Sequence, residues 1–172
     1  MIIRKASISD ASGIAKVQVD TWKTTYKGLV PDDYLDAMTY ESREQKWDMI
    51  LKEGTAYVAE DKGRIIGFSS GGMERTQKYP EFKGELYAIY ILEEYQRKGW
   101  GKKLIKPVVN DLLQKQIDSM TVTVLEDNPS RLFYESLGAV RLDSVEVEMA
   151  GVKLPERVYG WKDIKKILFT SE

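Results

Sequence analysis

The chain has 172 residues, of which 42% are hydrophobic and 31% charged, and its formal net charge is −1. This composition indicates one soluble globular domain over residues 1–172, and the near-zero charge argues against general binding to nucleic acid or to membrane surfaces. The chain contains no cysteine and no histidine. Disulfides, thiolate or histidine metal sites, a cysteine acyl-enzyme and a histidine base are therefore excluded, which leaves acid–base chemistry to Asp, Glu, Tyr, Lys or water.

The amino-terminal residues carry no secretory signal pattern, because no long apolar stretch follows Met1 to Lys5. No apolar run approaches the length that spans a bilayer. We therefore expect a cytoplasmic protein that uses no metal.

The first half of the chain predicts a strand, three helices and a hairpin. Residues 2–6 favour a strand, and a helix with N-cap candidates in 7–10 is expected to run to Lys27-Gly28. A short helix is expected from Pro31. A third helix over 41–52 is expected to face inward with Trp47, Ile50 and Leu51. Strands over 55–60 and 64–73 flank the hairpin turn signal Asp61-Lys62-Gly63.

The second half predicts alternating strands and helices. An apolar run over 86–92 favours a strand, and apolar residues recur at helical spacing from Leu104 to Ile117. Pro107 within this helix predicts a kink or, alternatively, an early end of the first helical turn. A strand is expected over 120–125. The next helix is expected to begin at Pro129 with Asn128 as its cap and Gly138 after its end. We expect its buried side to comprise Leu132, Phe133, Ser136 and Leu137. Strands over 140–147 and 154–161 and a short helical tail over 163–169 complete the pattern.

The loop from Tyr95 to Leu104 joins the 86–92 strand to the following helix. The first amides of that helix lack partners within it, and the helix dipole places partial positive charge there. Gly99 and Gly101 allow close approach of the backbone to a ligand, and formal charge comes from Arg97, Lys98, Lys102 and Lys103. The loop therefore indicates an anion site, most simply for phosphate, with an ordinary surface turn as the alternative.

Two blocks in this order resemble the GCN5-related N-acetyltransferase (GNAT) superfamily. They are Gln96-x-x-Gly99-x-Gly101 and the segment 128–138, Asn-Pro-Ser-Arg-Leu-Phe-Tyr-Glu-Ser-Leu-Gly. The resemblance implies an α/β (α+β) fold, with a mixed, mostly antiparallel sheet of about seven strands that is splayed between its fourth and fifth strands and flanked by helices. It also implies direct acetyl transfer from acetyl-CoA to a primary amine of a small-molecule or peptide acceptor. A non-catalytic acyl-CoA-binding regulatory module on the same fold is the alternative.

The resemblance also implies roles for particular residues. Pyrophosphate binding would fall to the loop residues Gln96, Arg97, Lys98, Gly99, Trp100, Gly101 and Lys102. The acetyl carbonyl would meet a backbone amide near Ile91, with Ile89 adjoining. Asn128 would either hydrogen-bond the pantetheine arm or only cap a helix, and it lies six residues before Tyr134 where many members have seven.

The remaining assignments concern the chemistry and the acceptor. Tyr134 is the candidate general acid, because a phenol is protonated at neutral pH and can protonate a thiolate. Glu85 is the candidate base through water, with Glu126 and Asp127 as alternatives. Trp22 and Tyr26 would wall the acceptor pocket, although core packing also explains Trp22. Edge strands near the carboxyl end are compatible with a homodimer.

Overall fold

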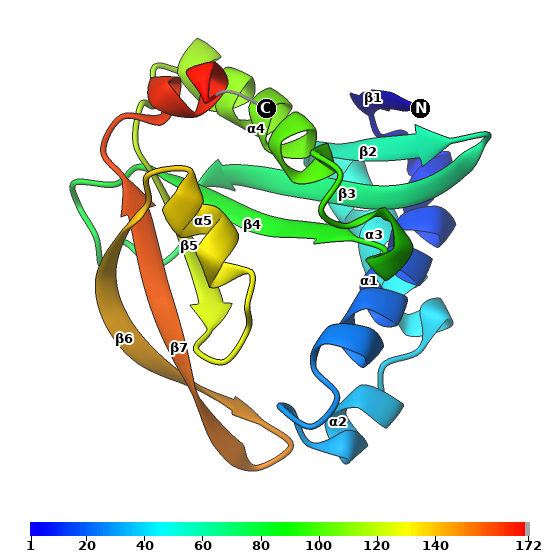
Figure 1. Cartoon of the computed structure of the whole chain (residues 1–172). Helices are drawn as coiled ribbons and strands as arrows, with labels where there is room; N and C mark the ends of the chain where they lie inside the picture. The colour runs from blue at the N-terminus through cyan, green and yellow to red at the C-terminus, as the bar shows by residue number, and fades with distance from the viewer. Residues whose placement is uncertain (171–172) are drawn as a thin grey trace.

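Seven strands form one sheet in the order β1-β2-β3-β4-β5-β7-β6 (Figure 1). The structure is a computed structural model that describes residues 1–170. The strands are β1 (Ile2–Lys5), β2 (Ala56–Asp61), β3 (Arg64–Met73), β4 (Gly84–Ile91), β5 (Met120–Leu125), β6 (Val140–Met149) and β7 (Val152–Trp161). The helices are α1 (Ala11–Thr25), α2 (Asp32–Asp36), α3 (Tyr40–Glu53), α4 (Trp100–Gln114) and α5 (Arg131–Ser136). Short 3₁₀ turns are η1 (Ile8–Asp10), η2 (Glu93–Tyr95) and η3 (Ile164–Phe169).

Helices cover both faces of the first half of the sheet. The absent Cβ of Gly67 in β3 would lie 3.1 Å from Leu104 of α4. Its neighbour Phe68 packs edge-on against Trp47 of α3, with ring centroids 5.0 Å apart. Adjacent strand residues point to opposite faces, so α4 and α3 lie on opposite sides of β3.

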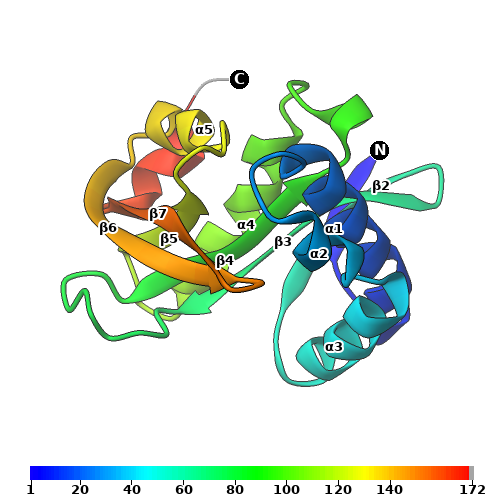
Figure 2. The same ribbon diagram turned by 90° about the horizontal axis from the view of Figure 1, so that it is seen from below.

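The sheet opens between β4 and β5, as expected. These strands are parallel, but their register joins only Gly84 with Met120 and Glu85 with Thr121. Beyond Glu85 they diverge, and the gap separates β1–β4 from β5, β7 and β6 (Figures 1 and 2). The wide end of the gap lies at the carboxyl ends of both strands.

The two halves also meet at the far end of the β6–β7 hairpin. Met149 near the hairpin tip belongs to one apolar cluster with Tyr26, Val30 and Leu35 of the α1–α2 region and with Leu125 at the end of β5. Figure 2 shows the hairpin reaching towards α2 across the gap. This cluster therefore closes one end of the space between β4 and β5.

The predicted order of elements is confirmed, and three details of the helices are wrong. The α5 helix begins at Arg131 with Ser130 as N-cap, not at Pro129. Its buried face is made by Tyr134 and Leu137, whereas Leu132 is 56% exposed and Ser136 is also exposed. In α3, Ile50 is 44% exposed, because Trp47 and Leu51, four residues apart, already occupy the inward face. The α4 helix continues through Pro107.

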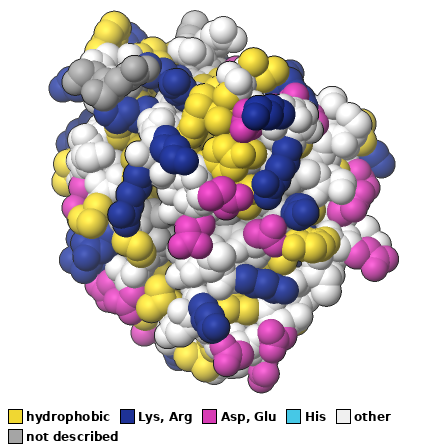
Figure 3. Space-filling model, turned by 45° about the vertical axis from the view of Figure 1, so that its right-hand side comes forward, with side chains coloured by type: hydrophobic (Ala, Val, Ile, Leu, Met, Phe, Trp, Pro, Cys, Tyr) yellow, Lys and Arg dark blue, Asp and Glu magenta, His cyan; other side chains and the backbone are white. Residues whose placement is uncertain are grey.

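Charges of both signs are mixed on the face that contains the α1 side of the molecule (Figure 3). Lysine and arginine side chains there are interspersed with aspartate and glutamate, so this face carries no extended basic field of the kind that nucleic acid requires. Among the described residues, no helix combines the length and the apolar composition of a membrane span.

Candidate active site

The loop between β4 and α4 has the backbone geometry of an anion site. Arg97 and Gly99 both have left-handed backbones, with φ of 59° and 82°. A Cβ at Gly99 would meet nothing within 4 Å, so that side of the loop is open. The hydrogen bond from Lys103 N–H to Gly99 O, at 3.4 Å, is the first of the α4 ladder. The amides of Trp100 and Gly101 precede it and are not used by the helix.

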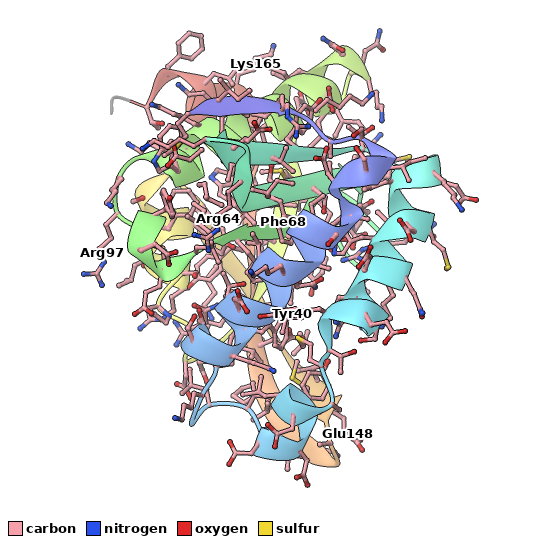
Figure 4. All side chains as sticks on the ribbon, turned by 90° about the vertical axis from the view of Figure 1, so that its right-hand side faces the viewer. Tyr40, Arg64, Phe68, Arg97, Glu148 and Lys165 are labelled. Atoms are coloured by element: carbon pink, nitrogen blue, oxygen red, sulfur yellow. The ribbon has the colours of Figure 1, made fainter. Side chains whose placement is uncertain are left out.

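Side chains of the loop hold its shape and surround it with positive charge. Gln96 donates from Nε2 to Ile91 O at 2.8 Å, which ties the loop to the end of β4. Lys98 donates from Nζ to Glu94 O at 2.7 Å. Lys103 Nζ lies 4.5 Å from the centre of the Trp100 ring. Arg97 is exposed and projects away from the loop into solvent (Figure 4).

Gly101 connects this loop to α5. A Cβ at Gly101 would lie 3.0 Å from Phe133 Cζ, a distance tighter than ordinary contact. Phe133 in turn lies 5.6 Å, centroid to centroid, from the ring of Tyr134. The glycine thus lets the start of α4 pack directly on the helix that carries the candidate acid, a requirement that the sequence pattern alone did not show.

A small cavity of about 80 Å³ lies in the gap between β4 and β5. Five of the predicted site residues line it together: Trp22, Tyr26, Ile89, Asn128 and Tyr134. Sequence reasoning missed the other polar and aromatic members of the lining, which are Tyr87, Tyr90, Thr123, Ser130 and Glu156. Residues from α1, β4, β5, β7 and α5 therefore converge on one space.

Tyr134 is buried in this lining and stays protonated. Its ring packs edge-on against Trp161, with centroids 6.1 Å apart and planes at 90°. Burial, and secondarily the neighbouring phenol of Tyr90, raise the pKa of Tyr134 well above its usual value. Burial likewise raises the pKa of Tyr26. The cavity thus holds phenols that are hydrogen-bond donors at neutral pH.

Asn128 links the start of α5 to the aromatic wall. Its Oδ1 accepts from Ser130 N–H at 2.9 Å, and its Nδ2 donates to the Tyr26 hydroxyl at 2.8 Å. Tyr26 and Asn128 are each 4% exposed. Asn128 therefore lies two residues before the N-cap of α5, which is Ser130, and the prediction that Asn128 caps this helix is wrong.

The carboxylates named from the sequence lie in ion pairs or outside the cavity lining. Glu85 is buried and accepts from Arg75 Nη2 at 2.6 Å and from Arg75 Nε at 3.2 Å. Glu126 forms an ion pair with Arg157 at 2.9 Å. Neither of them, nor Asp127, contributes to the cavity. Glu156 of β7 does line the cavity. It is brought there by its pairing with Leu125 in the β5–β7 register, which could not be predicted from the sequence.

A larger cavity, of about 390 Å³, lies between the start of α1 and the β2–β3 turn. Its Arg4 is engaged by Asp10 and Glu60, both at 2.8 Å. Its described lining contains no tyrosine and none of residues 96–102, although Leu92, directly after β4, contributes to it. The smaller cavity beside Tyr134, and not this larger one, therefore contains the aromatic and phenolic residues that were predicted from the sequence.

The open sheet, the glycine loop at a helix N-terminus and the phenol-lined gap define the fold of a coenzyme A-dependent acyltransferase. The chain belongs to the acetyltransferase (GNAT) family, whose profile matches residues 20–139. It is 41% identical to the uncharacterized N-acetyltransferase YuaI of Bacillus subtilis over 165 residues, which are 96% of this chain and 95% of the relative.

The chain is also similar to a curated enzyme in sequence and to a solved structure in fold. Over 105 residues, 60% of this chain and 65% of the relative, the chain is 29% identical to the spermidine N(1)-acetyltransferase of Thermoplasma acidophilum. The crystal structure of the PaiA N-acetyltransferase of the same organism, in complex with coenzyme A, matches with a TM-score of 0.71 and 22% identity, covering 91% of this chain and 98% of that one. The predicted family, fold and N-acetyltransferase class are thus confirmed.

Proposed function

We propose that this protein transfers the acetyl group of acetyl-CoA to a primary amine by direct attack in the cavity between β4 and β5. The observation that carries the proposal is the position of Tyr134. This phenol lines the cavity together with an aromatic wall, and its neighbour Phe133 packs on Gly101 at the start of α4. A helix N-terminus suited to a diphosphate and a proton donor are therefore held in one packed unit.

The loop residues fit the diphosphate of coenzyme A. The left-handed backbones of Arg97 and Gly99 turn the chain at the helix N-terminus, and the open side of Gly99 leaves room for a ligand. Bound acetyl-CoA would supply an activated thioester. We propose that residues 96–102 hold its diphosphate and that the backbone amide near Ile91, with Ile89 adjoining, polarises the acetyl carbonyl.

The residues of the cavity would then complete the transfer. Trp22 and Tyr26 position the acceptor so that its nitrogen attacks the carbonyl carbon. As the nitrogen–carbon bond forms, the carbon–sulfur bond breaks, and Tyr134 donates its hydroxyl proton to the departing sulfur. No acyl-enzyme is required, in agreement with the absence of cysteine from the sequence. The spermidine acetyltransferase activity named for one relative supports an amine acceptor here.

Tyr134→Phe tests the proposal. The variant keeps the ring and its packing on Trp161 and removes only the proton donor, so we expect turnover to fall about 10²-fold or more with coenzyme A affinity nearly unchanged. Tyr79→Phe is the matched control, because Tyr79 lies outside the cavity and its hydroxyl donates to Asp143. Equal turnover in wild type and Tyr134→Phe would contradict the assigned role.

The acceptor can be identified by incubating the protein with acetyl-CoA and each of a panel of primary amines. The rate at which the thiol of coenzyme A is released then measures transfer to each amine. Because the chain has no cysteine, the protein contributes no thiol background. Binding of coenzyme A without acetylation of any amine in the panel would favour the regulatory-module alternative.

A further inference from the structure

Among the described residues that line the cavity, Glu156 is the only one with an ionisable acidic or basic side chain other than the phenols. It lies on β7, where the register pairs it with Leu125 of β5 on one side and with Val145 of β6 on the other. Leu125 is the last residue of β5, so Glu156 lies at the wide end of the gap. The rest of the lining is aromatic, aliphatic or neutral and polar.

The side chain of Glu156 has no partner within residues 1–170. It makes no ion pair and no side-chain hydrogen bond in this part of the chain. The neighbouring cation, Arg157, is engaged by Glu126, with Nε–Oε1 and Nη2–Oε1 distances of 3.0 and 2.9 Å. Partial burial raises the pKa of Glu156 above its ordinary value. A half-buried carboxylate without a partner weakens a fold, so its presence needs a reason outside the fold.

Aromatic rings share the space with this carboxylate. Trp22 and Tyr26 lie 4.4 Å apart, and Trp22 and Tyr90 lie 6.5 Å apart, centroid to centroid. Tyr87 also contributes to the lining. An ammonium group is attracted both to a carboxylate and to aromatic faces, whereas an anion is repelled by both. The cavity thus selects for positive charge.

Resting on the proposed function, we infer that Glu156 binds the ammonium group of the acceptor and accepts its proton, and that the acceptor is an aliphatic primary amine with no anionic group beside the nitrogen. An α-amino acid would place its carboxylate close to Glu156, and like charges at that distance repel. A mono-, di- or polyamine has no such group.

The protons balance over one turnover. The ammonium gives its first proton to Glu156, so that the nitrogen becomes neutral. Glu156 then passes this proton to solvent. The nitrogen attacks the acetyl carbon and the carbon–sulfur bond breaks. After the nitrogen–carbon bond has formed, the nitrogen loses its second proton to solvent, and the Tyr134 phenolate regains a proton from solvent to replace the one given to sulfur. The products are the acetamide, the free thiol of coenzyme A and one released proton.

Glu156→Gln tests the inference, with Glu146→Gln as the matched control. Glu146 is exposed on β6, opposite Pro155, and lies outside the cavity. With the best amine of the panel, we expect Glu156→Gln to lower kcat/KM about 10²-fold or more, while the Kd of coenzyme A stays within about twofold of wild type. Since an unpaired carboxylate is removed, Tm should stay level or rise. Glu146→Gln should match wild type in all three measurements.

A pair of acceptors provides the second readout. Wild type should acetylate an alkylamine far faster than the α-amino acid with the same side chain, and Glu156→Gln should narrow that ratio because the repulsion is gone. Wild-type kcat/KM in Glu156→Gln, or a lowered Tm or weakened coenzyme A binding in that variant, would overturn the inference while leaving the proposed function standing. Failure of wild type to acetylate any amine would overturn both.

Discussion

The hydrogen bond between Asn128 and Tyr26 allows a quantitative prediction. Tyr26→Phe removes the acceptor of a 2.8 Å bond between two side chains that are each 4% exposed. The ring remains, and so does its packing on Trp22 at 4.4 Å. The loss is therefore that of a buried N–H left without an acceptor, about 1–3 kcal/mol of unfolding free energy. For a chain of this size, that corresponds to a fall in Tm of roughly 2–12 °C.

Urea denaturation and thermal unfolding of the same samples measure this loss, provided that the m-value does not change. Tyr40→Phe is the control, because the Tyr40 hydroxyl donates to Asp20 at an exposed position, where we expect a change within about 0.5 kcal/mol. In a cycle with Asn128→Ala, the two changes should be non-additive by about 0.5–3 kcal/mol. A Tyr26→Phe variant as stable as wild type, or strictly additive energies, would refute the reasoning.

Two further predictions concern the loop and the amino-terminal ion pair. Gly99→Ala places a side chain at a φ of 82° and should lower the unfolding free energy by about 1–2 kcal/mol. Gly101→Ala must displace Phe133 and should lower the unfolding free energy by about 1–3 kcal/mol, although alanine has the better helix propensity. A urea denaturation midpoint above that of wild type in either variant would contradict this account. The hydrogen bonds from Arg4 lower the pKa of Asp10 from 3.8 to about 2. The resulting stabilisation, about 2 kcal/mol, should be complete above about pH 4 and vanish as pH falls through 2, and Asp10→Asn should flatten that dependence in urea titrations at pH 4, 3 and 2.

Local patterns predicted the order of elements because each depends on near neighbours. The Lys62-Gly63 turn adopts two positive φ values, 50° and 81°, as a two-residue hairpin turn requires, and the glycine favours the second of them. Thr–Val alternation located β5 at Met120–Leu125, the predicted range. The motifs of residues 96–101 and 128–138 led to the correct family because they lie on the loop and helix that frame the gap.

Contacts between distant segments could not be predicted from those patterns. Glu85 was predicted to act as the base, and its ion-pair partner Arg75 lies in the segment between β3 and β4, which no local pattern placed beside it. Glu156 was overlooked because only the β5–β7 register brings it to the gap. The burial of Tyr134 in place of Leu132 depends on where α5 begins, and residue types alone did not distinguish a start at Arg131 from one at Pro129.

A sheet that opens in its middle has four borders instead of two. The outer pair, on β1 and β6, faces the surroundings, whereas the inner pair, on β4 and β5, faces across the gap. Beyond the Glu85–Thr121 pair these two strands no longer bond to each other, so main-chain groups on the inner borders can bond a ligand, whereas Ile91 O already accepts from Gln96 Nε2. These inner strand edges lie within the molecule and not on its surface. A strand from another molecule therefore finds no straight, exposed edge there on which aggregation could begin.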